Sequence, residues 1–253
     1  MKLWSGLVAM VALVLVAVAP EANSAGGTAI TSCGQVVTSN AFLTGHLVCT
    51  GDGIVVGASG ITIDLKGFTI RGDRGDGDRG IEDGGFDGVT IKNGVVRNFE
   101  YGVWAEPGAD AVTVQNLLAS GNVQDGIHIV GDSAAVKSST SSANFVGVGV
   151  VGNKATIKST NAWGNFQAGI SANGNFALIQ SSSAAGNHAV GIAVQGDSAV
   201  LKGNRAEANG FAGNASDLFP WGIYVVFFTT PPVGKNIARG NDDPAECNPT
   251  YLC

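Results

Sequence analysis

Five side chains with acid–base or sugar-binding chemistry recur at short intervals in the N-terminal half of the chain. Glu82, Trp104 and His128 each follow the aliphatic residue that opens a short β-prone segment, Glu106 lies two residues after Trp104, and Asp125 precedes His128 by three. An indole ring offers a flat apolar surface, carboxylates bind hydroxyl groups or cations, and imidazole transfers protons near neutral pH. The predicted ligand contacts are Trp104, Glu106, Glu82 and His128. The candidates for catalysis are His128, Asp125 and Glu82.

The densest group of charges is the loop at residues 71–83, where carboxylates alternate with glycine and arginine. Hard oxygen ligands on a glycine-rich loop suit Ca²⁺, which is the one candidate cofactor. The candidate calcium ligands are Asp73, Asp76, Asp78 and Asp83. A solvated turn insertion is the alternative, because the spacing matches neither an EF-hand nor a nonapeptide calcium repeat. The alternative to the ligand site is that Trp104 packs under this loop and that His128 is an ordinary surface residue.

A repeat that fills most of the chain must position these side chains. Six segments, most of nearly equal length, each open on an aliphatic-x-aliphatic strand, carry a second short aliphatic strand, reach an asparagine and close on glycine. This period predicts the stacked coils of a solenoid. The asparagines are expected to bond from coil to coil across about 4.8 Å. They are Asn98, Asn122, Asn144, Asn165, Asn187 and Asn209.

Alternation within each strand predicts which side chains fill the solenoid. The first-strand residues expected to point inward are Ile81, Val103, Ile127, Val148, Ile170, Ile192 and Ile223, and after them Ala105, Ile129, Val150, Ala172, Val194 and Val225. The second-strand stack is Ile63, Ile91, Val114, Val136, Ile157, Ile179 and Leu201. The residue after each member of that stack faces outward and is often lysine. This lysine column is either a plain soluble face or a stripe that binds polyanions.

Both ends of the chain carry signals of export. Lys2 and the apolar run at residues 7–19 predict a signal peptide over residues 1–25. An uncleaved membrane anchor is the alternative, but the apolar run is shorter than the roughly 20 residues that span a bilayer. Export favours disulfides, and four cysteines allow three pairings. Local pairing is favoured, Cys33 with Cys49 and Cys247 with Cys253, because each pair flanks one end of the repeats. Residues 26–53 and 242–253 are then caps around repeats at 54–241.

The composition limits the classes of partner that this chain is expected to bind. Only 13% of the residues are charged, 38 are glycine, and the formal net charge is −6. An acidic chain argues against nucleic acid and against an anionic membrane surface. We expect a monomer that is secreted or periplasmic, with no membrane span once the signal peptide is removed.

The three β segments per coil, the aliphatic stacks and the asparagine column resemble the right-handed parallel β-helix of the pectate lyase superfamily. The stretch at 33–67, with Gly88-Val89-Thr90-Ile91-Lys92-Asn93-Gly94, is similar to exported bacterial β-helix-repeat proteins. The resemblance implies an all-β, single-stranded right-handed parallel β-helix (a solenoid) of about eight coils, with N- and C-terminal caps. It also implies a polysaccharide partner.

The function we predict is binding of an extended, acidic polysaccharide on the first-strand face. A polysaccharide lyase or uronate epimerase is the first alternative, and a structural or cell-surface protein without a small ligand is the second. Glycoside hydrolysis of the polygalacturonase type has less support, because that reaction needs paired carboxylates from neighbouring coils. The coil after His128 offers Gly147-Val148-Gly149 instead.

Overall fold

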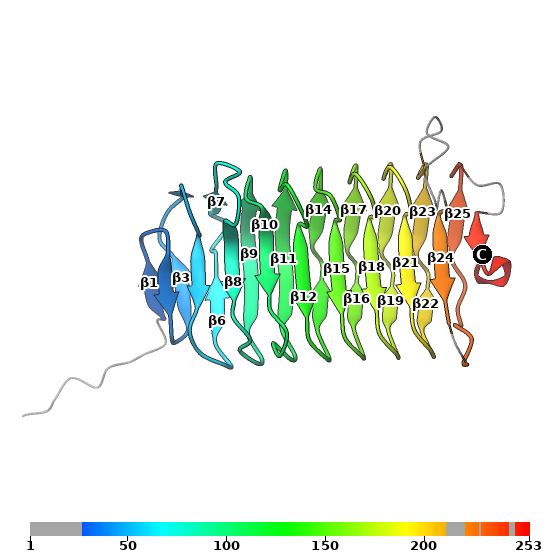
Figure 1. Ribbon diagram of the computed structural model, residues 1–253, viewed down its shortest axis with the longest axis horizontal. Helices are drawn as coiled ribbons and strands as arrows, with labels where there is room; N and C mark the ends of the chain where they lie inside the picture. Colours follow the sequence, from blue (N-terminus) through cyan, green and yellow to red (C-terminus); the bar gives the residue numbers. More distant parts are fainter. Residues whose placement is uncertain (1–26, 211–220, 228, 243–245) are drawn as a thin grey trace, which may run out of the picture.

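Short runs in which aliphatic and polar residues alternate become the strands of an elongated solenoid, whose coils follow one another along the long axis (Figure 1). The computed structural model describes residues 27–210, 221–227, 229–242 and 246–253. The predicted signal peptide at 1–25 therefore lies outside the described residues. The described part of the chain contains no helix with the length and hydrophobicity of a membrane span.

Strands of successive coils pair in parallel and form two long sheets. The first strand of each coil builds the ten-stranded sheet. Its members are β2 (Gln35–Val37), β5 (Ile54–Val56), β8 (Arg79–Asp83), β10 (Tyr101–Ala105), β12 (Ile127–Val130), β15 (Val148–Val151), β18 (Ile170–Asn173), β21 (Ile192–Gln195), β24 (Ile223–Val226) and β26 (Cys247–Asn248).

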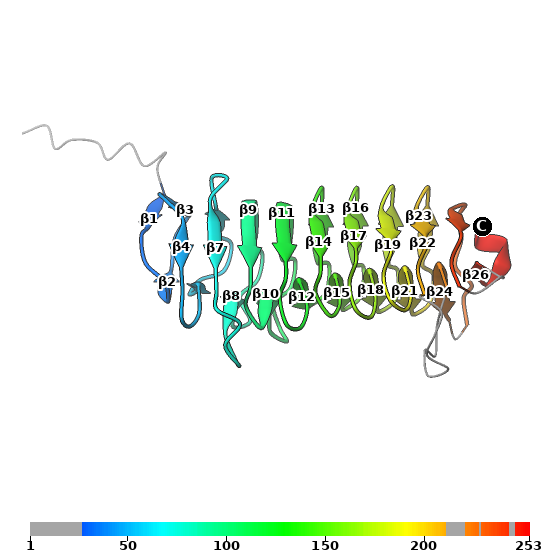
Figure 2. The same cartoon turned by 90° about the horizontal axis from the view of Figure 1, so that it is seen from above.

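The second and third β segments of the coils build a sixteen-stranded sheet, which Figure 2 shows as a separate layer. Its members are β1 (Thr28–Ile30), β3 (Ala41–Leu43), β4 (Leu47–Val48), β6 (Thr62–Asp64), β7 (Thr69–Arg71), β9 (Thr90–Arg97), β11 (Thr113–Ser120), β13 (Ala135–Lys137), β14 (Thr140–Ser142), β16 (Thr156–Lys158), β17 (Asn161–Trp163), β19 (Leu178–Gln180), β20 (Ser183–Ala185), β22 (Val200–Lys202), β23 (Arg205–Glu207) and β25 (Ile237–Arg239). In β9 and β11 the two segments run on as one strand.

The core lies between the two sheets and follows the predicted alternation. All the residues predicted to open the first strand, and the whole second-strand stack, have no exposed surface. Eight strands of the ten-stranded sheet, β5 to β24, lie within residues 54–241. The prediction of a parallel β-helix with about eight coils is confirmed.

The asparagine ladder runs through the turn that leads back to the first strand. Asn122, Asn144, Asn165 and Asn187 are buried, and each donates a hydrogen bond from its side-chain amide to the Oδ1 atom of the next ladder asparagine at 2.8–3.2 Å. The backbone N–H of each donates to the same oxygen. One side chain thus satisfies a buried N–H in the neighbouring coil, where water has no access.

The prediction for Asn98 is wrong by one position. Asn98 has a φ of 59°, and the residues that precede the other ladder positions share this left-handed conformation. Phe99 takes the ladder position, is fully buried, and donates its backbone N–H to Asn122 Oδ1 at 3.0 Å. Asparagine therefore serves here as a turn residue, a conformation that glycine supplies in several other coils.

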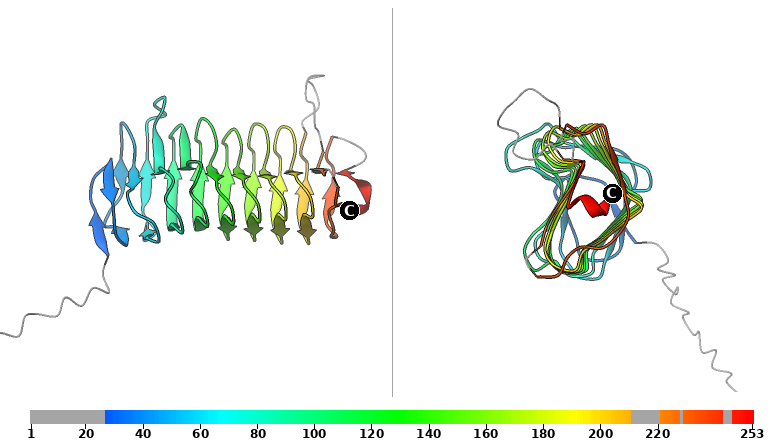
Figure 3. Two further views of the ribbon diagram at one scale, coloured as in Figure 1. Left: turned by 60° about the horizontal axis from the view of Figure 1, so that its bottom comes forward. Right: turned by 90° about the vertical axis from the view of Figure 1, so that its right-hand side faces the viewer.

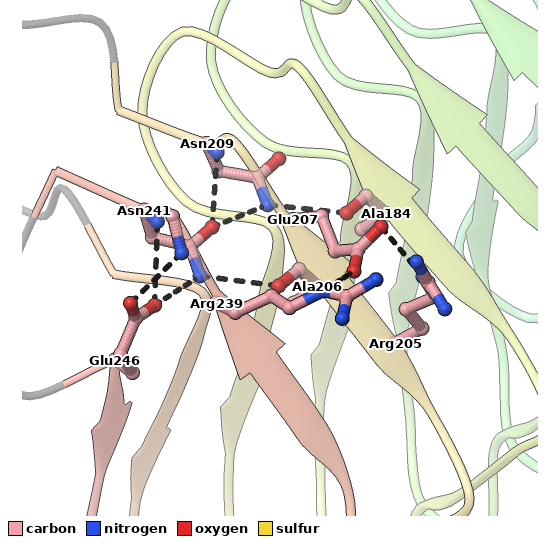
Figure 4. A network of polar contacts seen from close by, with 9 residues as sticks. Ala184, Arg205, Ala206, Glu207, Asn209, Arg239, Asn241 and Glu246 are labelled. Atoms are coloured by element: carbon pink, nitrogen blue, oxygen red, sulfur yellow. Dashed lines mark hydrogen bonds and ion pairs between the residues drawn. The ribbon is translucent and has the colours of Figure 1, made fainter.

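The ladder ends at the C-terminus on a carboxylate (Figure 4). Asn209 donates to Asn241, a ladder member that the sequence analysis missed. Asn241 in turn donates its side-chain amide to Glu246 Oε2 at 2.6 Å, and the N–H of Gly240 donates to Glu246 Oε1 at 2.9 Å. Glu246 thereby satisfies the donors of the last rung.

Disulfides close both ends of the solenoid. Cys33 pairs with Cys49 and Cys247 pairs with Cys253, so the predicted local pairing is confirmed. Viewed end-on, the coils superimpose, and the short 3-10 helix η1 (Thr250–Leu252) lies over the C-terminal end (Figure 3). Leu252 is fully buried there, so it covers the last apolar layer.

Candidate functional site

The outer face of the ten-stranded sheet brings three of the predicted site residues together. Trp104 on β10 is the register partner of Glu82 on β8 and of His128 on β12. Each follows an inward aliphatic residue, so alternation directs all three side chains outward. They lie roughly 4.8 Å apart from coil to coil.

The ring of Trp104 is covered from both neighbouring strands. The imidazole of His128 stacks on it with ring centroids 4.6 Å apart and planes within 12°. The guanidinium of Arg79, from the opposite neighbouring strand, lies 5.4 Å from the ring centroid, and Tyr101 packs at 4.4 Å. Trp104 is therefore the centre of an aromatic cluster, and little of its indole ring is left for contact with a ligand.

His128 is held by Asp125, which lies in the turn before β12. The Nδ1 atom of His128 is 2.6 Å from Asp125 Oδ2, and both side chains are mostly buried. A carboxylate only accepts hydrogen bonds, so this contact places the proton of the neutral imidazole on Nδ1 and leaves the Nε2 lone pair available. The pair has the geometry of a general base with an orienting carboxylate.

Glycine occupies the register position next to this pair. Gly149 is the register partner of His128, and a Cβ atom at this position would lie 3.2 Å from Asp125 Oδ2 and 3.4 Å from His128 Nδ1. Gly149 is itself buried, so a larger residue at this position would press against the Asp125–His128 pair.

Glu82 occupies the N-terminal side of the aromatic cluster. Burial raises the pKa of its carboxyl, Arg79 opposes that shift, and Asp52 and Glu106 add to it. Arg79 Nη1 lies 3.6 Å from Glu82 Oε1. Glu106, just beyond the end of β10, is half-buried and acts on Glu82 through its charge.

The structure does not bring the four predicted calcium ligands together. Asp83 is fully buried on the inward side of β8, where its Oδ1 atom accepts hydrogen bonds from the N–H groups of Gly85 and Phe86. It is thereby separated from the loop that carries Asp73, Asp76 and Asp78. Asp73 instead accepts from the N–H of Gly75 in a local turn. Among the described residues, no group of three or more His, Cys, Asp or Glu side chains is placed to hold a metal ion.

Sequence reasoning missed a groove over the middle coils of the same face. It has a volume of about 580 Å³. Ser171 and Ala193 form its floor, Phe145 and Phe166 flank one side, and Tyr224 closes one end. The signal in the sequence is a run of small outward residues, Gly149, Ser171 and Ala193, between the bulky His128 and Tyr224.

The two long sides of the groove differ in chemistry. On one side, Phe145 stacks on Phe166 with centroids 5.8 Å apart, and His188 continues the row at 5.4 Å from Phe166. On the other side stand the amides of Asn173 and Gln195. None of the described residues that line the groove is Lys, Arg, Asp or Glu.

Solved structures share this fold at low sequence identity. The enzymatically active domain of tailspike protein 2 from bacteriophage CBA120 has a TM-score of 0.65 and 16% identity, and the match covers 84% of this chain and 38% of that chain. The A-module of mannuronan C-5 epimerase AlgE4 from Azotobacter vinelandii has a TM-score of 0.53 and 16% identity over 85% of this chain and 79% of that one. At such identities the likeness concerns the fold alone.

Sequence comparison points to one family. Residues 46–219 match the family model described as "Periplasmic copper-binding protein (NosD)". No curated protein has a sequence that matches the chain. The predicted resemblance to β-helix proteins of the pectate-lyase-like superfamily is confirmed by the family match together with the solenoid and its structural neighbours.

Proposed function

This chain belongs to the NosD family, and we propose that it is an exported protein that binds an extended polysaccharide along the outer face of its ten-stranded sheet. The observation that carries the proposal is the groove whose floor is formed by Ser171 and Ala193 and whose end is closed by Tyr224. Two coil steps separate Ser171 from Tyr224 in register. At about 4.8 Å per coil this floor extends roughly 10 Å, a length that suits a short stretch of a polymer.

The sides of the groove match the two kinds of surface on a sugar. Phe145 and Phe166 offer apolar surface to the C–H face of a pyranose ring, while Asn173 and Gln195 can donate to and accept from hydroxyl groups. A mostly apolar lining with a few polar groups is typical of sites that bind small molecules. The disulfides at both ends and the family's periplasmic description support export.

Charge favours a neutral polymer over the acidic one predicted from the sequence. The groove itself has no charged lining, and its N-terminal approach carries Glu82, Glu106 and Asp125 against Arg79. A polyanion would be repelled by this excess of carboxylates. The tailspike and the epimerase that share the fold do not favour either kind of polymer, because their likeness to this chain extends to the fold only.

Filling the groove tests the proposal. Ala193→Trp places an indole on the groove floor, while Gln180→Trp places one on the outer face of the other sheet in the preceding coil. The assay is affinity electrophoresis in gels that contain glucan, xylan, pectate or alginate. The native protein should be retarded in a gel that contains one of the uncharged polysaccharides, glucan or xylan. We expect Ala193→Trp to lose this retardation and Gln180→Trp to keep it. Equal retardation of both variants in every gel would refute binding in the groove.

Catalysis is the second candidate, and the Asp125–His128 pair is the observation that favours it. With Nδ1 held by the carboxylate, Nε2 can accept the proton α to a uronate carboxylate. In a lyase the electron pair of that C–H bond then forms a double bond as the glycosidic C–O bond breaks. Absorbance of unsaturated uronate on pectate or alginate, lost in Asp125→Asn, would support this reaction; no absorbance on either polymer would count against it.

Copper, which the family description names, finds no ligand set in the described solenoid. Copper prefers imidazole, thiolate and thioether ligands. His46 Nδ1 already accepts a hydrogen bond from the backbone of Thr69, and the Nδ1 of His128 is held by Asp125. All four cysteines are in disulfides, and both methionines lie outside the described residues. The proposed function therefore includes no copper.

A further inference from the structure

A second hollow lies on the other sheet, over the same coils that carry the groove. It has a volume of about 320 Å³ and is lined by residues of β14, β17 and β20. Its largest apolar surface is the indole of Trp163, which is 54% exposed. Figure 2 shows these strands on a different side of the solenoid from β15 and β18, so the hollow and the groove are separate surfaces.

Small residues flank Trp163 on both sides along the sheet. Its register partners are Ser142 on β14 and Ala185 on β20, and both are small. This contrasts with Trp104, whose ring carries His128 on one side and Arg79 on the other. Ala162, beside Trp163, supplies the buried contact of this strand, so the core does not require an indole at Trp163.

A row of polar side chains stands beside the indole. Thr140, Asn161 and Ser183 are register partners in three successive coils and line the hollow together. Within the part of the chain that the structure describes, none of these three side chains makes a hydrogen bond, although their backbones are paired in the sheet. Two hydroxyl groups and one amide are thus available as donors and acceptors next to a flat apolar ring.

We infer that the Trp163 hollow is a second saccharide site, which takes one neutral pyranose unit. The C–H face of the sugar stacks on the indole, and its hydroxyl groups bond to Thr140, Asn161 and Ser183. The sugar is neutral because no charged side chain lines the hollow. The volume is at the lower end of the range for small-molecule sites, roughly 300–1,000 Å³, which fits one sugar unit and not a chain.

This site adds to the proposed groove and uses none of its residues. Two saccharide sites on different sides of the same coils allow one molecule to hold two polymer strands, or a chain and a branch. Simultaneous engagement raises the apparent affinity through effective concentration, even where each site alone is weak.

The indole N–H signals of the ¹⁵N-labelled full chain test this inference. The probes are the methyl glycosides of glucose, galactose, mannose and N-acetylglucosamine, and Trp163→Phe identifies the Trp163 signal. We expect at least one sugar to move this signal with a millimolar dissociation constant. Asn161→Ala should weaken that binding roughly fivefold by removing one hydrogen bond. Phe176→Ala, which removes an exposed aromatic ring from the turn before β19, should leave it unchanged.

Three results would overturn the inference. The first is a Trp163 signal that none of the four sugars moves. The second is equal binding by Asn161→Ala and the native protein. The third is a native dimer that Trp163→Ala converts to a monomer, which would make the hollow an interface between copies. Thermal unfolding of each variant identifies any loss of folding, and Ala193→Trp should leave the Trp163 response intact because that residue lies in the groove.

Discussion

Replacing one rung of the asparagine ladder should cost far more stability than replacing an exposed asparagine a few residues away. Asn165 is fully buried and its side chain makes four hydrogen bonds. Its Oδ1 atom accepts from the backbone and side-chain amides of Asn144, and its Nδ2 donates to Ser141 O and Asn187 Oδ1. Asn165→Ala removes all four bonds and leaves a void.

The magnitude follows from the groups left behind. The backbone N–H of Asn144 loses its acceptor in a buried turn, at a cost of about 1–3 kcal/mol. The side-chain amide of Asn144 keeps partners in Ala119 O and Ser141 Oγ, and Asn187 Oδ1 still accepts from the N–H of Asn165. Because the bond to Ser141 O is also lost, the expected decrease is about 2–4 kcal/mol of unfolding free energy.

Urea unfolding of Asn165→Ala and Asn161→Ala measures this difference. Asn161 is exposed on β17 and its side chain makes no hydrogen bond within the described residues, so its replacement should change stability by about 0.5 kcal/mol or less. The comparison is valid where the dependence on urea has the same slope in both variants. A difference below about 0.5 kcal/mol between the variants would refute the reasoning, because it would mean that Asn144 finds another acceptor at little cost.

Three further predictions concern the end of the ladder, a buried carboxyl and the groove. Glu246→Ala should lower the unfolding free energy by about 1–2 kcal/mol and speed amide hydrogen exchange at Asn241; unchanged exchange there would contradict the capping role. Burial raises the pKa of the Asp83 carboxyl, so the folded state binds its proton more tightly than the unfolded chain, and stability falls as pH rises from the ordinary aspartate pKa near about 4 to the raised pKa of the folded state. Urea unfolding at several pH values should show that the unfolding free energy of Asp83→Asn rises relative to that of the native protein above about pH 4. A difference in unfolding free energy that does not change with pH would contradict this assignment. Ser171→Leu should fill part of the groove floor and weaken retardation in polysaccharide gels at least tenfold with an unchanged circular dichroism spectrum; full retardation would contradict binding over this residue.

The coil was predictable because strand alternation and the repeat act on every residue in the same way. The same rule could have corrected one site residue. Asp83 stands two positions after the inward Ile81, so alternation places it inside, away from the loop of Asp73 and Asp78. The density of carboxylates in that loop suggested a metal site, but the strand that starts there divides them.

The error at Asn98 has a different origin. In most coils the ladder asparagine follows a glycine or alanine in the left-handed conformation, as in Gly121-Asn122 and Gly164-Asn165. In the earlier coil, asparagine itself takes that turn position and the next residue is Phe99. Both roles suit asparagine, so residue type alone does not distinguish them.

The sequence was sufficient to predict which site residues are neighbours, but not which of their surfaces are exposed. Register alone places Trp104 beside Glu82 and His128. Whether the indole face is open depends on the rotamers of Arg79 and Tyr101, which the sequence does not specify. The groove was missed because it results from a succession of missing side chains rather than from any reactive group.

The constant register between coils limits how such a protein can change its reach. Removing residues 148–169 would delete one whole coil. Ile170 would then pair with Ile127 as Val148 does now, and Asn187 would accept from Asn144 as Asn165 does now. The distance from His128 to Tyr224 would shrink by roughly 4.8 Å. Deleting a single residue within a strand would instead put the inward side chains of that strand outside. Evolution can therefore lengthen or shorten this face of the sheet only by whole coils, so its possible lengths differ by steps of one coil.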